Sequence, residues 1–155
     1  MIRIRKAAAG DLAGIGELLL SSGLPTEGVA GHLGFFLVAE AGGRIVAAAG
    51  LEMGDGCALL RSVTVDPSSR GAGLGVEIVR QALRLASVSG AGSVYLLTTT
   101  AAGFFPRFGF TPALRSEVDA LFPESAETGP DGGCASAEAM VLRDLSRVLV
   151  PHPRS

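Results

Sequence analysis

The segment Val63-Thr64-Val65-Asp66-Pro67-Ser68-Ser69-Arg70-Gly71-Ala72-Gly73-Leu74-Gly75 joins a strand-like apolar run to the start of an amphipathic helix. Its glycines let several backbone N–H groups converge without side chains in the way. A helix N-terminus that presents such amides binds anions. We therefore expect residues 70–75 to hold a phosphate group, with Arg70 adding a charge-assisted contact.

Two other phosphate-binding loops fit this segment less well. The dinucleotide fingerprint places G-x-G-x-x-G directly after its strand and an acidic residue about twenty positions later. Here the third glycine comes one position early, residues 66–69 intervene, and Ser93–Thr98 contains no acid. A Walker loop requires Gly-Lys-Ser/Thr, which the segment lacks. A simple glycine turn is the remaining alternative, and the flanking strand and helix argue against it.

Strand-like and helix-like patterns continue on both sides of the loop. Apolar residues recur at helical spacing from Gly75 onward, and two glycine-containing turns separate three strand-like runs upstream. In chain order we expect a strand at 2–5, a helix after Asp11, a loop or short helix at 22–34, strands at 35–40, 44–52 and 57–65, a helix from Gly75, a strand at 93–98, a short helix at 101–108, and strands at 110–114 and 137–145. This order predicts an α/β fold with a mixed, mostly antiparallel sheet flanked by helices.

The composition is that of one ordered domain. The chain has 155 residues, of which 48% are hydrophobic and 18% charged, so it is too apolar to remain disordered. We expect a single domain over residues 1–147, a long loop at 124–136 and a loose tail over 148–155.

The net charge, the apolar runs and the cysteine spacing of the chain argue against several classes of partner. A net charge of -2, with no concentration of Lys and Arg, argues against nucleic acid. Asp11 and Glu17 interrupt what would have to be a signal peptide, and no apolar run approaches the ~20 residues that cross a bilayer. Cys57 and Cys134 lie outside any metal-ligand spacing. The sequence predicts a cytoplasmic protein with no metal site and no membrane contact.

Two blocks of sequence resemble the GNAT acetyltransferases. Arg70-x-x-Gly73-x-Gly75 resembles the Q/R-x-x-G-x-G/A signature of that family, and residues 63–67 resemble its fourth strand. Residues 95–100 (Tyr-Leu-Leu-Thr-Thr-Thr) and 103–110 (Gly-Phe-Phe-Pro-Arg-Phe-Gly-Phe) resemble the block that lines the pantetheine and thiol end of the cofactor. The resemblance covers nearly the whole chain.

Shorter stretches resemble particular members of this family. Arsenic-resistance-type N-acetyltransferases are similar at residues 24–27, 36–40, 49–52, 59–62, 98–100 and 134–137. The Leu-Thr-Thr-Thr stretch at 97–100 also resembles the acetyltransferase domain of N-acetylglutamate synthases.

The resemblance implies a GNAT fold and direct attack of a substrate amine on the thioester of acetyl-CoA, with both substrates bound together. The backbone near Val63 and Val65 would hold pantetheine and polarise the thioester carbonyl. The residues expected to bind the cofactor are Val63, Val65, Arg70, Gly71, Ala72, Gly73, Leu74, Gly75, Val76, Thr100 and Phe105.

The proton-transfer groups are harder to assign. Many GNAT enzymes protonate the departing thiolate with a tyrosine, but Phe105 stands at the matching position. A thiol with a pKa of ~8.5 leaves as a stable enough anion without that acid.

The acceptor amine must lose a proton before it attacks. At pH 7 neutralising an α-amine costs about 1.4 kcal/mol, against about 4.6 kcal/mol for a lysine amine, so a site poor in bases suits an α-amine. Glu52 is the candidate base, acting through water, and a merely solvated carboxylate is the alternative.

Three further residues are candidates for substrate binding. Arg61 interrupts an apolar strand and could hold a substrate carboxylate. It could instead point to the outer face, or pair structurally with an acid such as Glu52. Thr98 could offer its hydroxyl, as could the neighbouring threonines. Cys134 could supply a thiol in place of the missing tyrosine, although a buried structural cysteine is the alternative.

The function predicted from the sequence is transfer of acetyl from acetyl-CoA to a primary amine of a small, amino-acid-like molecule that carries a carboxylate. A protein N-terminal or lysine acetyltransferase is one alternative, and a non-catalytic acyl-CoA-binding sensor is another. The sequence names neither the amine nor an arsenic-containing substrate. Exposed edges of the last strands are compatible with a homodimer.

Overall fold

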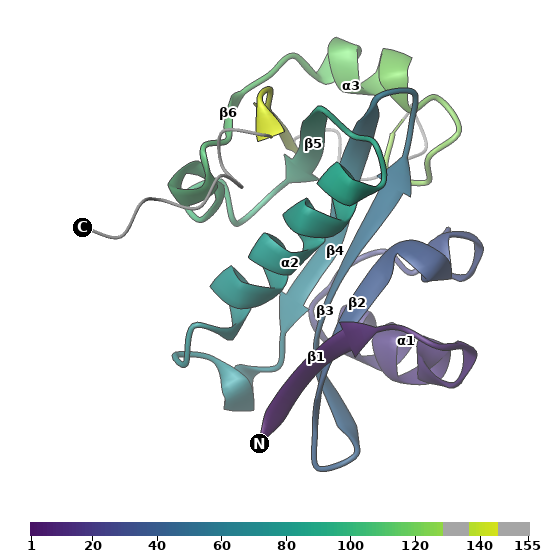
Figure 1. Cartoon of the computed structure of the whole chain (residues 1–155), viewed down its shortest axis with the longest axis vertical. Helices are drawn as coiled ribbons and strands as arrows, with labels where there is room; N and C mark the ends of the chain where they lie inside the picture. The colour runs from purple at the N-terminus through teal and green to yellow at the C-terminus, as the bar shows by residue number, and fades with distance from the viewer. Residues whose placement is uncertain (129–136, 146–155) are drawn as a thin grey trace.

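The computed structural model describes residues 1–128 and 137–145 (Figure 1). The predicted tail at 148–155 and most of the predicted loop at 124–136 lie outside the described residues. The elements in chain order are β1 (Ile2–Lys6), η1 (Ala9–Asp11), α1 (Leu12–Ser21), η2 (Ala30–Phe35), β2 (Phe36–Ala41), β3 (Arg44–Met53), β4 (Cys57–Val65), η3 (Pro67–Ser69), α2 (Leu74–Val88), β5 (Ser93–Thr98), η4 (Phe105–Phe108), β6 (Thr111–Pro112), α3 (Arg115–Leu121) and β7 (Glu138–Leu142).

The strands form one mixed sheet in the order β1-β2-β3-β4-β5-β7-β6. Every neighbouring pair is antiparallel except β4 and β5, which run parallel. This confirms the predicted mixed, mostly antiparallel α/β fold. The parallel pair joins Cys57–Leu60 of β4 to Ser93–Leu96 of β5, and the ladder stops there although both strands continue.

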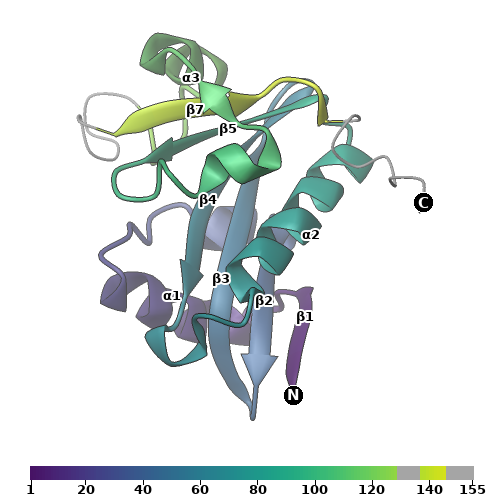
Figure 2. The ribbon, with the colours of Figure 1, turned by 90° about the vertical axis from the view of Figure 1, so that its left-hand side faces the viewer.

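The helices cover both faces of the sheet (Figure 2). Helix α2 packs on one face, where Ile78 and Leu83 join a core that includes Ala49 of β3. Helix α1 packs on the other face, where Ile15 meets Ala48. Successive residues of a strand point to opposite faces, so the alanine run in β3 lets helices approach from both sides. Helix α3 covers the far end of the face that α1 covers.

A bulge interrupts the pairing of β3 with β4. Gly50 pairs with Arg61 but Ala48 pairs with Thr64, so β4 contains one more residue than β3 over this interval. Ser62 within the interval has a φ of 59°, which is uncommon for a residue with a side chain. A bulge bends its strand and increases the local twist. It lies just beyond the point where the β4–β5 ladder stops.

The structure differs from the sequence prediction most after residue 108. The strand expected at 110–114 is reduced to the two residues of β6, and helix α3 follows where no helix was predicted. Val118 and Phe122 are buried one helical turn apart against Leu59 and Tyr95, so contact with the sheet stabilises this short helix. The short helix expected at 101–108 is the 3₁₀ turn η4.

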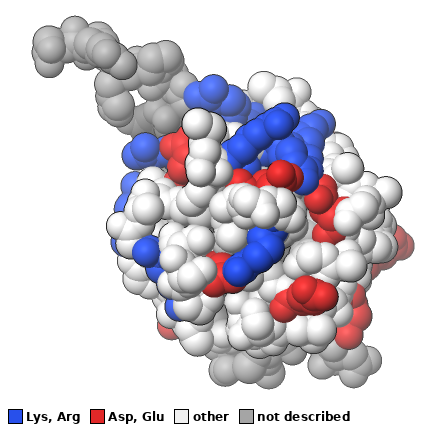
Figure 3. Space-filling view, turned by 90° about the horizontal axis from the view of Figure 1, so that it is seen from below, with Lys and Arg blue, Asp and Glu red and all other residues white. Residues whose placement is uncertain are grey.

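Ion pairs connect β1 to β2 and to the turn before α1, and β3 to the segment after β4. Arg5 donates hydrogen bonds to Asp11 and Glu40, both at 2.7 Å, and Arg44 pairs with Asp66 at 2.7 Å. On the face seen in Figure 3, basic and acidic side chains lie next to one another.

No helix among the described residues is long and apolar enough to cross a membrane.

Candidate active site

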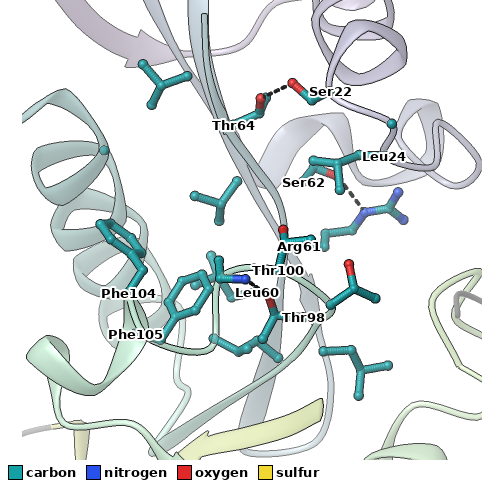
Figure 4. A pocket seen from close by; sticks show the side chains of 18 of the residues that line it. Ser22, Leu24, Leu60, Arg61, Ser62, Thr64, Thr98, Thr100, Phe104 and Phe105 are labelled. Atoms are coloured by element: carbon teal, nitrogen blue, oxygen red, sulfur yellow. Dashed lines mark hydrogen bonds between the residues drawn. The ribbon is translucent and has the colours of Figure 1, made fainter. Parts of the chain in front are cut away.

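A cavity of about 1330 Å³ opens where β4 and β5 separate. Its walls come from both strands, the N-terminus of α2, the segment after α1, the aromatic segment around η4, and Glu127. Figure 4 shows side chains of β4 and β5 beside Phe104 and Phe105. One continuous cavity therefore connects the glycine loop to the polar residues on the far side of β4.

The glycine loop forms one end of the cavity. Gly71 and Gly73 have φ values of 92° and 77°, in the left-handed region that residues with side chains rarely adopt. Gly73 is the N-cap of α2, so the first amides of this helix lack intrahelical partners and lie in the cavity wall. Their amides and the positive end of the helix dipole favour a bound anion.

Two arginines line the cavity near this loop. Arg70 donates from Nε to the carbonyl of Val65 at 3.1 Å, which fixes its side chain against β4. Arg107 lies 4.6 Å above the ring of Phe104 and donates to the backbone carbonyl of that residue. Their charges add to the attraction for phosphate. The sequence reasoning singled out Arg70 but missed Arg107.

The exposed edge of β4 forms the middle of the cavity. Beyond Leu60, β4 is not paired with β5. On the side that faces β5, the backbone from Arg61 to Val65 therefore makes no strand-to-strand hydrogen bonds. Val63 and Thr64 lie in the cavity wall. An extended ligand containing amide groups can pair with such an edge as a strand would.

Thr98, Thr100 and Phe105 lie opposite this edge. Thr98 Oγ1 accepts a hydrogen bond from the amide of Ala101 at 3.0 Å, and so stabilises the turn after β5. Phe105 is buried, with its ring 5.2 Å from that of Phe104. All three of these predicted residues line the cavity. The wall beside Phe105 is apolar and aromatic.

A buried polar cluster forms the other end of the cavity. Arg61 donates from Nη1 to Glu52 Oε2 at 2.8 Å and from Nε to Ser62 Oγ at 2.9 Å. Its Nη2 makes a longer contact of 3.4 Å with the carbonyl of Pro25. Glu127 Oε1 lies 3.7 Å from Arg61 Nε. The Arg61 side chain is fully buried, and acidic groups approach it from two segments.

The structure brings Arg61 and Glu52 together, but only one of them lines the cavity. Arg61 lies in the cavity wall, whereas Glu52 does not and sits buried behind it. Glu52 also approaches His32, with 3.5 Å between Oε1 and Nε2. Cys134 lies outside the described residues. Within the described ranges no group of His, Cys, Asp and Glu is arranged to hold a metal ion.

Glu127 is a site residue that the sequence reasoning missed. Burial raises the pKa of its carboxyl group, the charge of Arg61 lowers it, and the negative charges of Glu52 and Glu27 raise it further. The net effect is a pKa above the ordinary value of a glutamate. Glu127 lies in a segment that the sequence predicts only as a loop, and no motif there distinguishes it from Glu124.

Comparison with known proteins agrees with this geometry. The family described as Acetyltransferase (GNAT) domain matches residues 32–112, which is 81 of 155 residues. A search of curated proteins gave no significant match.

Several solved structures with the same fold are bound to coenzyme A or acetyl-CoA. N-acetylglutamate synthase from Neisseria gonorrhoeae, complexed with coenzyme A and N-acetyl-glutamate, has a TM-score of 0.76 at 22% identity, over 92% of this chain and 35% of that one. Rv2747 from Mycobacterium tuberculosis, in complex with CoA and NLQ, has a TM-score of 0.73 at 23% identity, over 91% and 98% of the two chains.

A third structure, a GNAT family acetyltransferase from Brucella melitensis in complex with acetyl-CoA, has a TM-score of 0.61 at 27% identity, over 72% of this chain and 83% of that one. The present chain spans about a third of the Neisseria enzyme, whereas it spans nearly the full length of the Mycobacterium protein. The family match, the sheet that opens between β4 and β5, and the glycine loop at α2 agree, so the chain belongs to the GNAT family of acetyl-CoA-dependent N-acetyltransferases.

Proposed function

We propose that this protein transfers the acetyl group of acetyl-CoA to the primary amine of a small, amino-acid-like molecule that carries a carboxylate. The observation that carries this proposal is the single cavity that joins an anion-binding helix N-terminus to the paired charges of Arg61 and Glu127. Such a cavity admits a phosphate-bearing donor from one end and a small charged acceptor from the other.

The donor occupies the half of the cavity between α2 and the aromatic wall. Its pyrophosphate binds the backbone of residues 70–76, with Arg70 and Arg107 beside it. Its pantetheine arm extends along Val63 and Val65, on the edge of β4 that β5 leaves unpaired. Thr100 and Phe105 line the opposite wall, and Phe105 excludes water from the thioester.

The acceptor occupies the half of the cavity beyond the bulge. An amino acid carries an ammonium and a carboxylate a few ångströms apart, and the wall offers an anion and a cation at a similar spacing in Glu127 and Arg61. Nη2 of Arg61 is the donor available to the carboxylate because its contact with Pro25 is long. The guanidinium is buried, so this contact requires the loop containing Pro25 to move outward. Thr98 lines the same cavity.

Two resemblances support this class of acceptor. The structure of the Neisseria N-acetylglutamate synthase, with which this chain shares its fold, contains N-acetyl-glutamate. The short stretches that resemble arsenic-resistance-type enzymes also motivate including an arsenic-containing amino acid among the acceptors tested.

A panel of amines tests the proposal by measuring release of coenzyme A. Each amino acid is compared with its own amide, which keeps the α-amine but removes the carboxylate. We expect turnover of amino acids with kcat/KM at least about tenfold above that of the amides, since a charged hydrogen bond contributes about 1.5–3 kcal/mol. Turnover confined to peptides would indicate a protein acetyltransferase. Coenzyme A binding without any turnover would indicate a sensor.

A further inference from the structure

Two carboxylates approach one arginine at the acceptor end of the cavity, and a third lies near enough to act on one of them. Arg61 of β4 carries the positive charge, and Glu52 of β3 and Glu127 are its acidic neighbours. Glu27, from the loop after α1, also acts on Glu127 electrostatically and lines the cavity. His32 of η2 contacts Glu52. The carboxylates outnumber the arginine, so this end of the cavity attracts an ammonium group.

Glu52 and Glu127 differ in how their carboxylates are used. The Glu52 carboxylate accepts a hydrogen bond of 2.8 Å from Arg61 and lies behind the cavity wall. Glu127 lies in the wall, and its side chain is 16% exposed. Among the described residues, the Glu127 carboxylate accepts no hydrogen bond, and its approach to Arg61 is 3.7 Å. Glu127 is therefore the acid of this pair that remains available to a ligand.

The backbone around Glu127 is held independently of its carboxylate. The amide of Glu127 donates to Ser125 Oγ at 3.0 Å, and Thr128 Oγ1 donates to the carbonyl of Phe122, a buried residue that follows α3. This turn packs against Gly28, where an added β-carbon would lie 3.7 Å from the Ala126 side chain. The fold thus positions the side chain at the cavity without a hydrogen bond to its carboxylate among the described residues.

We propose that Glu127 is the catalytic base, which takes a proton from the acceptor ammonium before the nitrogen attacks the thioester. This inference rests on the proposed function, because it assigns a role within that reaction. The raised pKa of Glu127 supports it: burial and the charges of Glu52 and Glu27 outweigh the effect of Arg61. A carboxylate whose pKa lies closer to the working pH is a stronger base.

The acceptor nitrogen loses two protons during the reaction. The acceptor R–NH₃⁺ gives one proton to the Glu127 carboxylate, and the neutral nitrogen forms a C–N bond with the carbonyl carbon of acetyl-CoA. The C–S bond then breaks, and its electron pair leaves on sulfur as the coenzyme A thiolate. The nitrogen, cationic after attack, loses its second proton to the thiolate, directly or through water. Glu127 returns the first proton to solvent.

Glu127→Gln tests the inference because glutamine keeps the size of the side chain and removes the base. We expect kcat/KM for an amino-acid acceptor to fall by roughly 100-fold or more near neutral pH. The loss should shrink as pH rises toward about 9, where much of an α-amine is already neutral. The KM for acetyl-CoA should not change. Glu124→Gln, an exposed glutamate of the same segment, is the matched control and should retain wild-type rates.

Glu52→Gln separates a base from a positioning residue. We expect this variant to raise the KM of the acceptor equally at every pH, because Glu52 orients Arg61, and Glu52→Asp should restore part of the loss. A pH-dependent loss in Glu52→Gln with none in Glu127→Gln would instead return the base role to Glu52 and overturn the inference.

Two other results would also overturn it. Wild-type rates in Glu127→Gln from about pH 6 to about 9 would do so while leaving the proposed function intact, since an α-amine pKa of ~8 lies within that range. A wild-type protein that binds coenzyme A but acetylates no amine would overturn both, and calorimetry with coenzyme A identifies this case.

Discussion

Gly75 occupies the position in the glycine loop where charge can be changed with least disturbance. It is the second residue of α2 and has an ordinary helical backbone, unlike Gly71 and Gly73, whose positive φ values penalise any side chain. A β-carbon added at Gly75 would make ordinary contacts of 3.6 Å with Phe104 and Val65. Substitutions here therefore test the anion site rather than the fold.

We expect Gly75→Asp to weaken coenzyme A binding by roughly 100-fold or more, because a carboxylate would then face the pyrophosphate at short range. Gly75→Asn has nearly the same shape without the charge and should bind markedly better than Gly75→Asp. Isothermal calorimetry measures both affinities. An acidic residue in the first turn stabilises a helix, so Gly75→Asp should not melt earlier than Gly75→Asn. Equal affinities would mean that the pyrophosphate binds elsewhere.

Phe105 stands where the sequence resemblance leads us to expect a tyrosine acid. Its ring packs against Phe104 and lies 5.8 Å from Phe110 in an apolar wall. We expect Phe105→Tyr to change kcat by less than about tenfold, because a thiolate with a pKa near ~8.5 leaves without an acid. Steady-state kinetics over a range of pH measures this. An acceleration by orders of magnitude would show that thiolate departure limits the natural protein.

At the scale of elements, the junction between β1 and α1 carries a pH-sensitive contribution to stability. Asp11 accepts hydrogen bonds from Arg5 and from the amide of Ala8. The Arg5 hydrogen bond, followed by the Ala8 amide, lowers the pKa of Asp11 from 3.8 to about 2. The unfolded state therefore binds more protons between these pH values, and stability falls as pH drops through this window.

Asp11→Asn should lower the free energy of unfolding by about 1 kcal/mol at neutral pH, a typical loss for a capping carboxylate. The difference from wild type should be complete above pH 3.8 and should shrink as pH falls toward about 2. Urea unfolding at several pH values measures it. Glu17→Gln, an exposed change on α1, is the control. A difference that stays constant down to pH 2 would show that the Asp11 pKa is not lowered.

Elements with strong local patterns could be predicted from the sequence. The strands from β2 to β5 and helix α2 follow from apolar runs, glycine turns and helical spacing. Helix α3 could not be predicted, because its burial depends on contacts of Val118 with distant strands. The bulge at Ser62 likewise depends on pairing with β3.

In the candidate site, too, residues within a local sequence motif could be predicted, whereas residues placed by contacts distant in the sequence could not. The glycine loop has a local sequence signal, and the structure places it at the N-terminus of α2. Glu127 has none, because it reaches the cavity only when the turn after α3 folds against Gly28 and Arg61. For Arg61, pairing with Glu52 was one of the alternatives open from the sequence, and the structure shows that pair.

At the scale of the whole molecule, the cavity lies where β4 and β5 separate, and its two ends differ in character. One end of the cavity is formed by the N-terminus of α2 and the glycine loop, and the other by the segment after α1 and by Glu127. The bulged edge of β4 lies between the two ends. The proposed direct transfer needs both substrates bound together, and one continuous cavity would allow this. The homodimer expected from the exposed last strands stays a prediction, which light scattering would test.

The central claim is direct transfer of acetyl from acetyl-CoA to a small amine within this cavity. Incubation with isotopically labelled acetyl-CoA and the preferred amino acid, followed by mass spectrometry of both protein and small molecules, tests it most directly. The account predicts the label on the amino group of the acceptor as an amide, and none on the protein. Label retained covalently on the protein, or no labelled acceptor although coenzyme A binds, would contradict it.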